Sequence, residues 1–183
     1  MAFGITICSN ALLMLGANPI ADFSENNDRA RLCSNLYPST RDAVLRAHPW
    51  NCVVKRVILS PDVTPPVFGF RYAYPLPSDF LRLLSLNTDD YQTEGGRIYC
   101  NVNTLHLRYI WRNEDDTTWD TLLTDVMEIF MAAKLAYAIT GSASLRESYF
   151  QQAAMTLKQA KAISGQENPA EELGGYPLLE ARQ

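Results

Sequence analysis

The sequence lacks the compact motifs that identify most small enzymes and metalloproteins. It contains no CxxC pair, no GxGxxG run and no phosphate-binding glycine loop. Its four cysteines stand singly along the chain, a pattern more typical of reduced thiols than of a disulfide framework. These absences argue against catalysis and against a bound cofactor.

The sequence also lacks an excess of positive charge and a long apolar run. Its net charge is -4; residues 53–112 hold five acids and seven bases, whereas residues 113–183 hold eleven acids and five bases. This profile is not that of a protein that grips nucleic acid by its phosphates. No uncharged apolar stretch is long enough to span a bilayer, so no membrane segment is expected. The first basic residue is Arg29, so the apolar start does not resemble a signal peptide.

Two His/Cys pairs are the candidates for a metal or catalytic site: His48 with Cys52, and Cys100 with His106. Zinc needs four ligands that converge on a tetrahedron, and these spacings are atypical of that geometry. A Cys–His nucleophile needs a third group to orient the base. No sequence signature of a known nucleophile family surrounds Cys52 or Cys100. We therefore expect no catalytic residue, no metal ligand and no cofactor. A small zinc-bearing or Cys–His enzyme is the alternative hypothesis.

Apolar periodicity divides the chain into a helical zone, a β zone and a second helical zone. Residues 1–51 and 113–165 are expected to pack as one helical bundle, and residues 52–112 to form an inserted antiparallel β-rich lobe. Residues 166–183 contain prolines and a Gly-Gly pair, and are expected to be an extended C-terminal docking tail. The predicted fold class is therefore α+β.

Local signals predict where several elements begin. Ser24 is expected to open the second helix and Pro38 to kink or restart it. Thr117 and Asp120 have the spacing of helix N-caps, and Ser144 fits a capping box.

Strand patterns fill residues 52–112, where Gly95-Gly96 predicts a hairpin turn. Alternation from Leu105 to Trp111 places His106 and Arg108 on the polar face of a half-buried strand. We expect a meander of short antiparallel strands.

One predicted helix is apolar almost all round. From Leu122 to Ile139, fourteen of eighteen residues are apolar, so the helix should be covered on more than one side. Neighbouring copies of the chain could cover part of it, with Leu123, Met127, Phe130 and Met131 as the subunit interface. Alternatively, the helix is the centre of a single bundle in a monomeric binding module.

The tail carries a short apolar motif between acidic residues. Tyr176, Pro177, Leu178 and Leu179 follow Gly174-Gly175 and precede Glu180. An apolar motif on an extended acidic segment is typical of a docking peptide that binds a partner groove. The alternative is a tail that folds back on its own domain.

Five further stretches are informative when taken together: ICSNALLMLGANPI, ARLCSNLYPSTRDAVLRAHPWNCVVKRVIL, FGFRYAYPLPSDFLRLLSL, LRYI and ITGSASLRESYFQQAAMTLKQAKAI. They resemble the tail tubular protein A family of short-tailed bacteriophages. The most specific part is HPWN followed by the aromatic YAYPLP segment, and the resemblance covers roughly residues 5–165.

This resemblance implies a structural virion protein, the head-to-tail adaptor, connector or gatekeeper. Such proteins form a dodecameric ring between the portal protein and the tail nozzle protein, extend the DNA channel and offer a platform to tail fibres. Genomic DNA would pass through during ejection without sequence-specific binding. The protein would be assembled in the host bacterial cytoplasm and reside in the phage neck. The portal contact would fall to residues 166–183.

Overall fold

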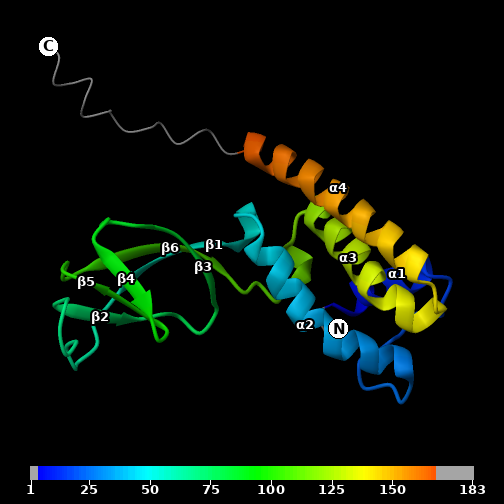
Figure 1. The fold of residues 1–183 in the computed structure, drawn as a ribbon, viewed down its shortest axis with the longest axis horizontal. Helices are drawn as coiled ribbons and strands as arrows, with labels where there is room; N and C mark the ends of the chain where they lie inside the picture. The colour runs from blue at the N-terminus through cyan, green and yellow to red at the C-terminus, as the bar shows by residue number, and fades with distance from the viewer. Residues whose placement is uncertain (1–3, 168–183) are drawn as a thin grey trace, which may run out of the picture.

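Four helices and six strands make up residues 4–167, the part of the chain that the computed structural model describes (Figure 1). The helices form one body: α1 (Ile5–Met14), α2 (Asp28–Arg46), α3 (Thr121–Thr140) and α4 (Ala143–Glu167). The strands form a lobe beside it: β1 (Val54–Leu59), β2 (Tyr72–Pro75), β3 (Phe80–Leu86), β4 (Tyr91–Glu94), β5 (Arg97–Cys100) and β6 (Leu105–Trp111). Two single-turn 3₁₀ helices, η1 (Asn51–Val53) and η2 (Asp116–Thr118), flank the lobe. The α+β class predicted from the sequence is confirmed.

The second helix starts later than predicted and does not stop at its proline. The side chain of Asn27, not Ser24, caps α2 by accepting a hydrogen bond from the Ala30 amide at 2.8 Å. Such a cap stabilises a helix by about 1 kcal/mol. The helix then runs through Pro38 without a break, although proline removes one backbone donor. Packing of the buried face of α2 outweighs that local cost.

The last two helices are joined by a tight turn. Asp120 caps α3 as predicted, with its carboxylate 2.6 Å from the Leu122 amide. Gly141 ends α3 at a φ of 71°, a left-handed conformation that glycine adopts without strain. The next cap is Ser142, whose hydroxyl accepts from the Leu145 amide at 3.1 Å, and not Ser144. The helix α4 continues past the expected end of the bundle at residue 165 to Glu167.

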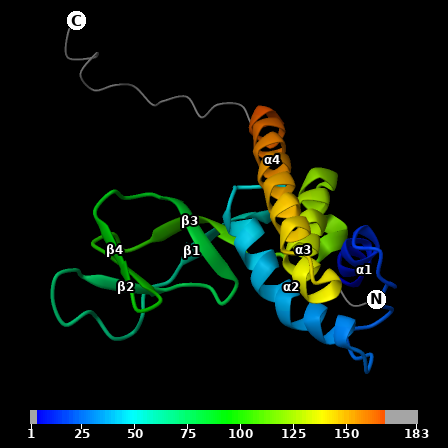
Figure 2. The same ribbon diagram turned by 45° about the vertical axis from the view of Figure 1, so that its right-hand side comes forward.

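The helix α3 is the centre of the body (Figure 2). The helices α1, α2 and α4 each pack on it, while α2 and α4 make little direct contact with each other. The body core also takes side chains from the near end of the lobe, including Val53, Leu81 and Ile110. The body and the lobe therefore share one apolar junction.

The lobe contains two three-stranded antiparallel sheets instead of the predicted meander. Their strand orders are β1-β6-β3 and β2-β5-β4, so most neighbours are not consecutive in sequence. The predicted hairpin is present: Gly95 and Gly96 join β4 to β5 with φ values of 55° and 74°. Two consecutive positive φ values are the requirement of a type I′ turn.

A second apolar core lies between the two sheets. The strand β6 alternates as predicted, with Leu105, Leu107 and Tyr109 buried and His106 exposed. Tyr74, Ile98 and Cys100 from the other sheet complete this core. The polar face of β6 therefore points out of the lobe.

The chain enters and leaves the lobe at neighbouring points. The Asn113 amide donates to the Cys52 carbonyl at 3.0 Å and to the Thr118 hydroxyl at 2.8 Å. Trp50, 1% exposed, covers the same junction and donates from Nε1 to the Val44 carbonyl at 3.2 Å. Trp50 thus has a structural role at the junction between body and lobe.

Candidate interaction surfaces

The members of each His/Cys pair lie in different surroundings. The ring of His48 packs edge-on against Trp50, with 4.8 Å between ring centroids, and Cys52 is half-buried at the junction. Cys100 is fully buried between the two sheets, whereas His106 is exposed on the outer face of the lobe. Within residues 4–167, no group of three or more His, Cys, Asp or Glu side chains is placed to hold a metal ion.

The electrostatics at these groups do not activate a nucleophile. Burial raises the pKa of the Cys52 thiol and that of the Cys100 thiol, which favours the unreactive protonated form. Burial also lowers the pKa of His48, and the nearby cations Lys161 and Arg82 add to that effect.

Most of the proposed subunit interface lies inside one chain. Leu123, Met127 and Met131 are each 0% exposed, because α1, α2 and α4 cover them. They leave no surface for a second copy. The alternative interpretation of the apolar helix, as the centre of a single bundle, accounts for this burial.

Phe130, the fourth interface candidate, is half-buried in a groove over α3. The groove runs between α2 and α4 and holds a volume of about 150 Å³. Its lining is apolar except for Thr40 and Lys134, and it includes Val44, Phe150 and Leu157. Burial in these surroundings lowers the pKa of the Lys134 ammonium.

The loop between β1 and β2 presents a concentrated apolar surface. Val63 and Val67 are each 98% exposed and Phe68 is 87% exposed. The loop lies at the end of the lobe away from the helices (Figure 1). The base of the loop is fixed at Asp62, whose amide donates to the Ala73 carbonyl at 2.7 Å and whose carboxylate pairs with Arg97 at 3.2 Å. The signal for this loop was PPVFGF, an apolar run beside two prolines.

The outer face of the β1-β6-β3 sheet presents a basic surface. Arg56 lies opposite Arg108, and Ile58 opposite His106, in the register of β1 and β6. With Ser85 these side chains line a hollow of about 450 Å³, and Ile58 is 66% exposed in it. No carboxylate is among the described residues that line it.

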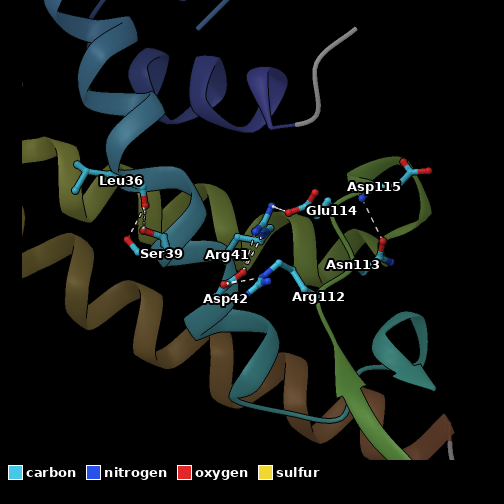
Figure 3. A network of polar contacts seen from close by, with 9 residues as sticks. Leu36, Ser39, Arg41, Asp42, Arg112, Asn113, Glu114 and Asp115 are labelled. Carbon is cyan, nitrogen blue, oxygen red and sulfur yellow. Dashed lines mark hydrogen bonds and ion pairs between the residues drawn. The ribbon is translucent and has the colours of Figure 1, made fainter. Parts of the chain in front are cut away.

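An ion-pair network joins the body to the connection after β6 (Figure 3). Arg41 of α2, 8% exposed, pairs with Glu114 and Asp42, each at 3.0 Å. The other oxygen of Asp42 accepts from Arg112 Nε at 2.9 Å. Asp42 therefore bridges two arginines, one from each part of the molecule.

A second polar contact holds the lobe together near this network. Asp79 accepts hydrogen bonds from Lys55 at 2.7 Å and from the Tyr109 hydroxyl at 2.9 Å. Burial opposes ionisation of Asp79, but these bonds outweigh it, so the pKa of Asp79 is lowered. Burial, together with the bond to Asp79, raises the pKa of Tyr109 to about 12. The Lys55 ammonium also lies 3.5 Å from the centroid of the Trp111 ring, a cation–π contact.

The predicted docking motif of the tail and the expected absence of a membrane segment remain to be compared with the structure. Tyr176, Pro177, Leu178 and Leu179 lie outside the described residues. Over residues 4–167, the helices are too short or too polar for any of them to cross a membrane. Comparison with protein-family models and with curated proteins gave no significant match for this sequence.

Proposed function

We propose that this chain is a structural protein of the phage virion: a head-to-tail adaptor that forms a dodecameric ring between the portal and the tail nozzle. In this role it extends the DNA channel, offers a platform to tail fibres and performs no catalysis. The proposal starts from the resemblance of residues 5–165 to the tail tubular protein A family.

The observation that carries the proposal is the exposed apolar tip of the β1–β2 loop. Single exposed apolar side chains are common on soluble proteins. Here Val63, Val67 and Phe68 are almost fully exposed within six residues of sequence, on a loop whose base is fixed by Asp62. A grouped apolar surface of this kind is typical of a contact with another protein. It supports an assembling protein better than an isolated enzyme.

The architecture is consistent with the resemblance. The helical body carries an inserted β lobe, as the apolar periodicity of the sequence predicts. The two parts are fixed to each other by the Asp42 bridge between Arg41 and Arg112. A rigid two-part subunit can offer the body to one ring and the lobe to another partner.

Contacts between copies fall on exposed side chains in this proposal. Met155 is 66% exposed and Ile163 45% exposed on α4, and Leu13 and Met14 are exposed at the end of α1. These replace the buried Leu123, Met127 and Met131 as candidates. Each copy carries a net charge of -4, so a ring of copies repels phosphates overall and lets DNA slide without binding.

The test is assembly on a template. The purified chain is mixed with the portal protein of the same virus, and the product is imaged by electron microscopy. We expect a closed ring of this chain on one end of the portal, with the same number of copies in every particle. Portal particles that carry no such ring at saturating concentration would refute the adaptor role. Bound metal in stoichiometric amount, lost in His48→Ala or Cys52→Ala, would instead favour the enzyme alternative.

A further inference from the structure

The basic outer face of the β1-β6-β3 sheet combines cationic and apolar groups. Arg56 and Arg108 are directly opposite each other across β1 and β6. The Arg56 side chain is exposed on this face, where it can attract an anion. The exposed Ile58 lies next in line on β1 and offers an apolar contact beside the charges. An occupant of this face should therefore carry carboxylates followed by an apolar group.

The described chain ends close to the start of the strand that carries Arg56. The Asn51 amide donates to the Glu167 carboxylate at 3.0 Å, so the last residue of α4 lies against the start of η1 and β1. The strand β1 lies at the edge of its sheet and leads from that point to Arg56 and Ile58. A segment that follows Glu167 therefore starts at the near end of the basic face.

The sequence after Glu167 has the composition that this face requires. It places Glu171-Glu172 first, Gly174-Gly175 next, and then the apolar run from Tyr176 to Leu179. Acids come before apolar residues in the tail, as arginine comes before isoleucine along β1.

The spacings also agree. Arg56 is five residues beyond Asn51. The rise per residue of a 3₁₀ turn and of a strand puts about 13–16 Å of backbone between these two residues. Glu171 and Glu172 are four and five residues beyond Glu167, which an extended chain spans in at most about 14–18 Å. Tyr176, nine residues on, reaches at most about 30 Å, enough to pass Ile58 at about 20 Å. The segment is therefore long enough for its acid pair to reach Arg56 and for Tyr176 to reach Ile58.

We propose that the segment around Glu171 and Glu172 binds the basic outer face of the sheet in its own chain, with the carboxylates on Arg56 and Arg108 and the apolar run beyond them beside Ile58. The contact is intramolecular because a short connection gives the tail a high effective concentration at the face. Exposed ion pairs are individually weak and are screened by salt, so the contact is reversible. A partner that captures the tail must first displace it.

This inference does not depend on the adaptor role, because its test uses the isolated full-length chain. A glutamate-specific protease is added at low ionic strength, and cleavage after Glu171 and Glu172 is followed by mass spectrometry. Wild type is compared with Arg56→Gln, and with Arg71→Gln as a control that removes an equal charge from an exposed residue outside this face. We expect cleavage about fivefold faster in Arg56→Gln than in wild type, and unchanged in Arg71→Gln.

A second measurement locates the contact on the sheet. Backbone amide spectra of the full-length chain are compared between wild type and the double variant Glu171→Gln/Glu172→Gln, with Glu180→Gln as the matched control. We expect shifts in β1 and β6 around Arg56 and Arg108 for the double variant only. Salt at about 0.5 M should abolish the difference between the spectra.

Three results would overturn the inference. Equal cleavage in wild type and Arg56→Gln would show that the acid pair is not held by this face. Shifts confined to the groove between α2 and α4 would place the tail on the helices. Protection that increases with protein concentration would assign the face to the tail of a second copy, which contradicts an intramolecular contact.

Discussion

Arg41 of α2 and Glu114, which follows β6, form an ion pair with 3.0 Å between Nη1 and Oε1, although they are far apart in sequence. The Arg41 side chain is 10% exposed and the Glu114 side chain 61% exposed. The pair therefore links the interior of the body to the surface connection that leaves the lobe. Asp42 extends the link to Arg112 and shares its charge between both arginines.

Removal of the Asp42 carboxylate should destabilise the fold. In Asp42→Ala, Arg41 loses one of its two acidic partners while its guanidinium stays buried, and Arg112 loses its ion pair. We expect the free energy of unfolding in urea to fall by about 2 kcal/mol. The control is Arg31→Ala, which removes an exposed ion pair with Asp28 and should cost less than about 0.5 kcal/mol. Equal effects of the two substitutions would show that the bridge adds no stability.

Acid should weaken the lobe through Asp79. The pKa of Asp79 is lower in the folded chain than its ordinary value of 3.8, so its bonds to Lys55 and Tyr109 stabilise the fold above that value. This contribution is lost as the pH falls below 3.8 and through the folded pKa. In Asp79→Asn, stability should be lower at neutral pH and should fall less between pH of about 5 and about 3. Urea midpoints measured across that range test this, with the exposed Asp89→Asn expected to retain the wild-type dependence.

The thiols should be protected in the native protein. Cys8, Cys33 and Cys100 are 0% exposed, and Cys52 is half-buried with a raised pKa. At neutral pH a chromogenic disulfide reagent should modify Cys52 first, about tenfold more slowly than free cysteine. The other three should react only when the chain unfolds. Rapid native modification of more than one thiol, located by mass spectrometry, would contradict the burial described.

Lys134→Met should stabilise the body. The Lys134 ammonium lies in the apolar groove beside Phe130, and burial lowers its pKa. Methionine removes the partly desolvated charge and keeps a long apolar side chain, so we expect a gain of about 0.5–1 kcal/mol in unfolding free energy. Lys158→Met on the exposed face of α4 is the control and should give no gain. A loss of stability in Lys134→Met would indicate that the ammonium has a favourable role.

The apolar loop should matter for assembly and not for folding. Val67→Ser/Phe68→Ser changes side chains that are 98% and 87% exposed, so the unfolding free energy should stay within about 0.5 kcal/mol of wild type. Under the proposed adaptor role, the double variant should reduce incorporation into the neck assembly at least about tenfold. Arg71→Ser, exposed in the same connection, is the matched control. Full incorporation of the double variant would remove the loop from the interface.

Regular elements could be predicted because they follow a period. The strand β6 alternates its burial as its sequence does, and the pair Gly95-Gly96 marks its turn by backbone conformation alone. Helix starts are harder to predict because several short polar residues precede each helix. Asn27 and Ser142 hold the hydrogen bonds that Ser24 and Ser144 were expected to make. Which of several neighbouring polar residues becomes the N-cap depends on where tertiary packing fixes the first turn of the helix.

Partners across the fold could not be predicted in the same way. A period of two indicates which face of a strand is buried, but not which strand lies beside it, so the β1-β6-β3 order was not foreseen. The apolar composition of α3 indicated that several sides are covered, but not whether Leu123 and Met127 meet their own chain or another. The basic face could not be predicted without the strand register, because Arg56 and Arg108 lie opposite each other only through the pairing of β1 with β6.

The hydrogen bond between Asn113 and the Cys52 carbonyl spans 61 positions of sequence and brings the two crossings between body and lobe together. Residues 53–112 therefore form one insertion whose two ends are held together at a fixed point of the helical body. Replacement of this insertion by another should leave the packing of the four helices unchanged. The new insertion must supply apolar side chains in the places where Leu81 and Ile110 enter the core of the body. The outer contacts of the lobe can therefore change without a change in how the four helices pack.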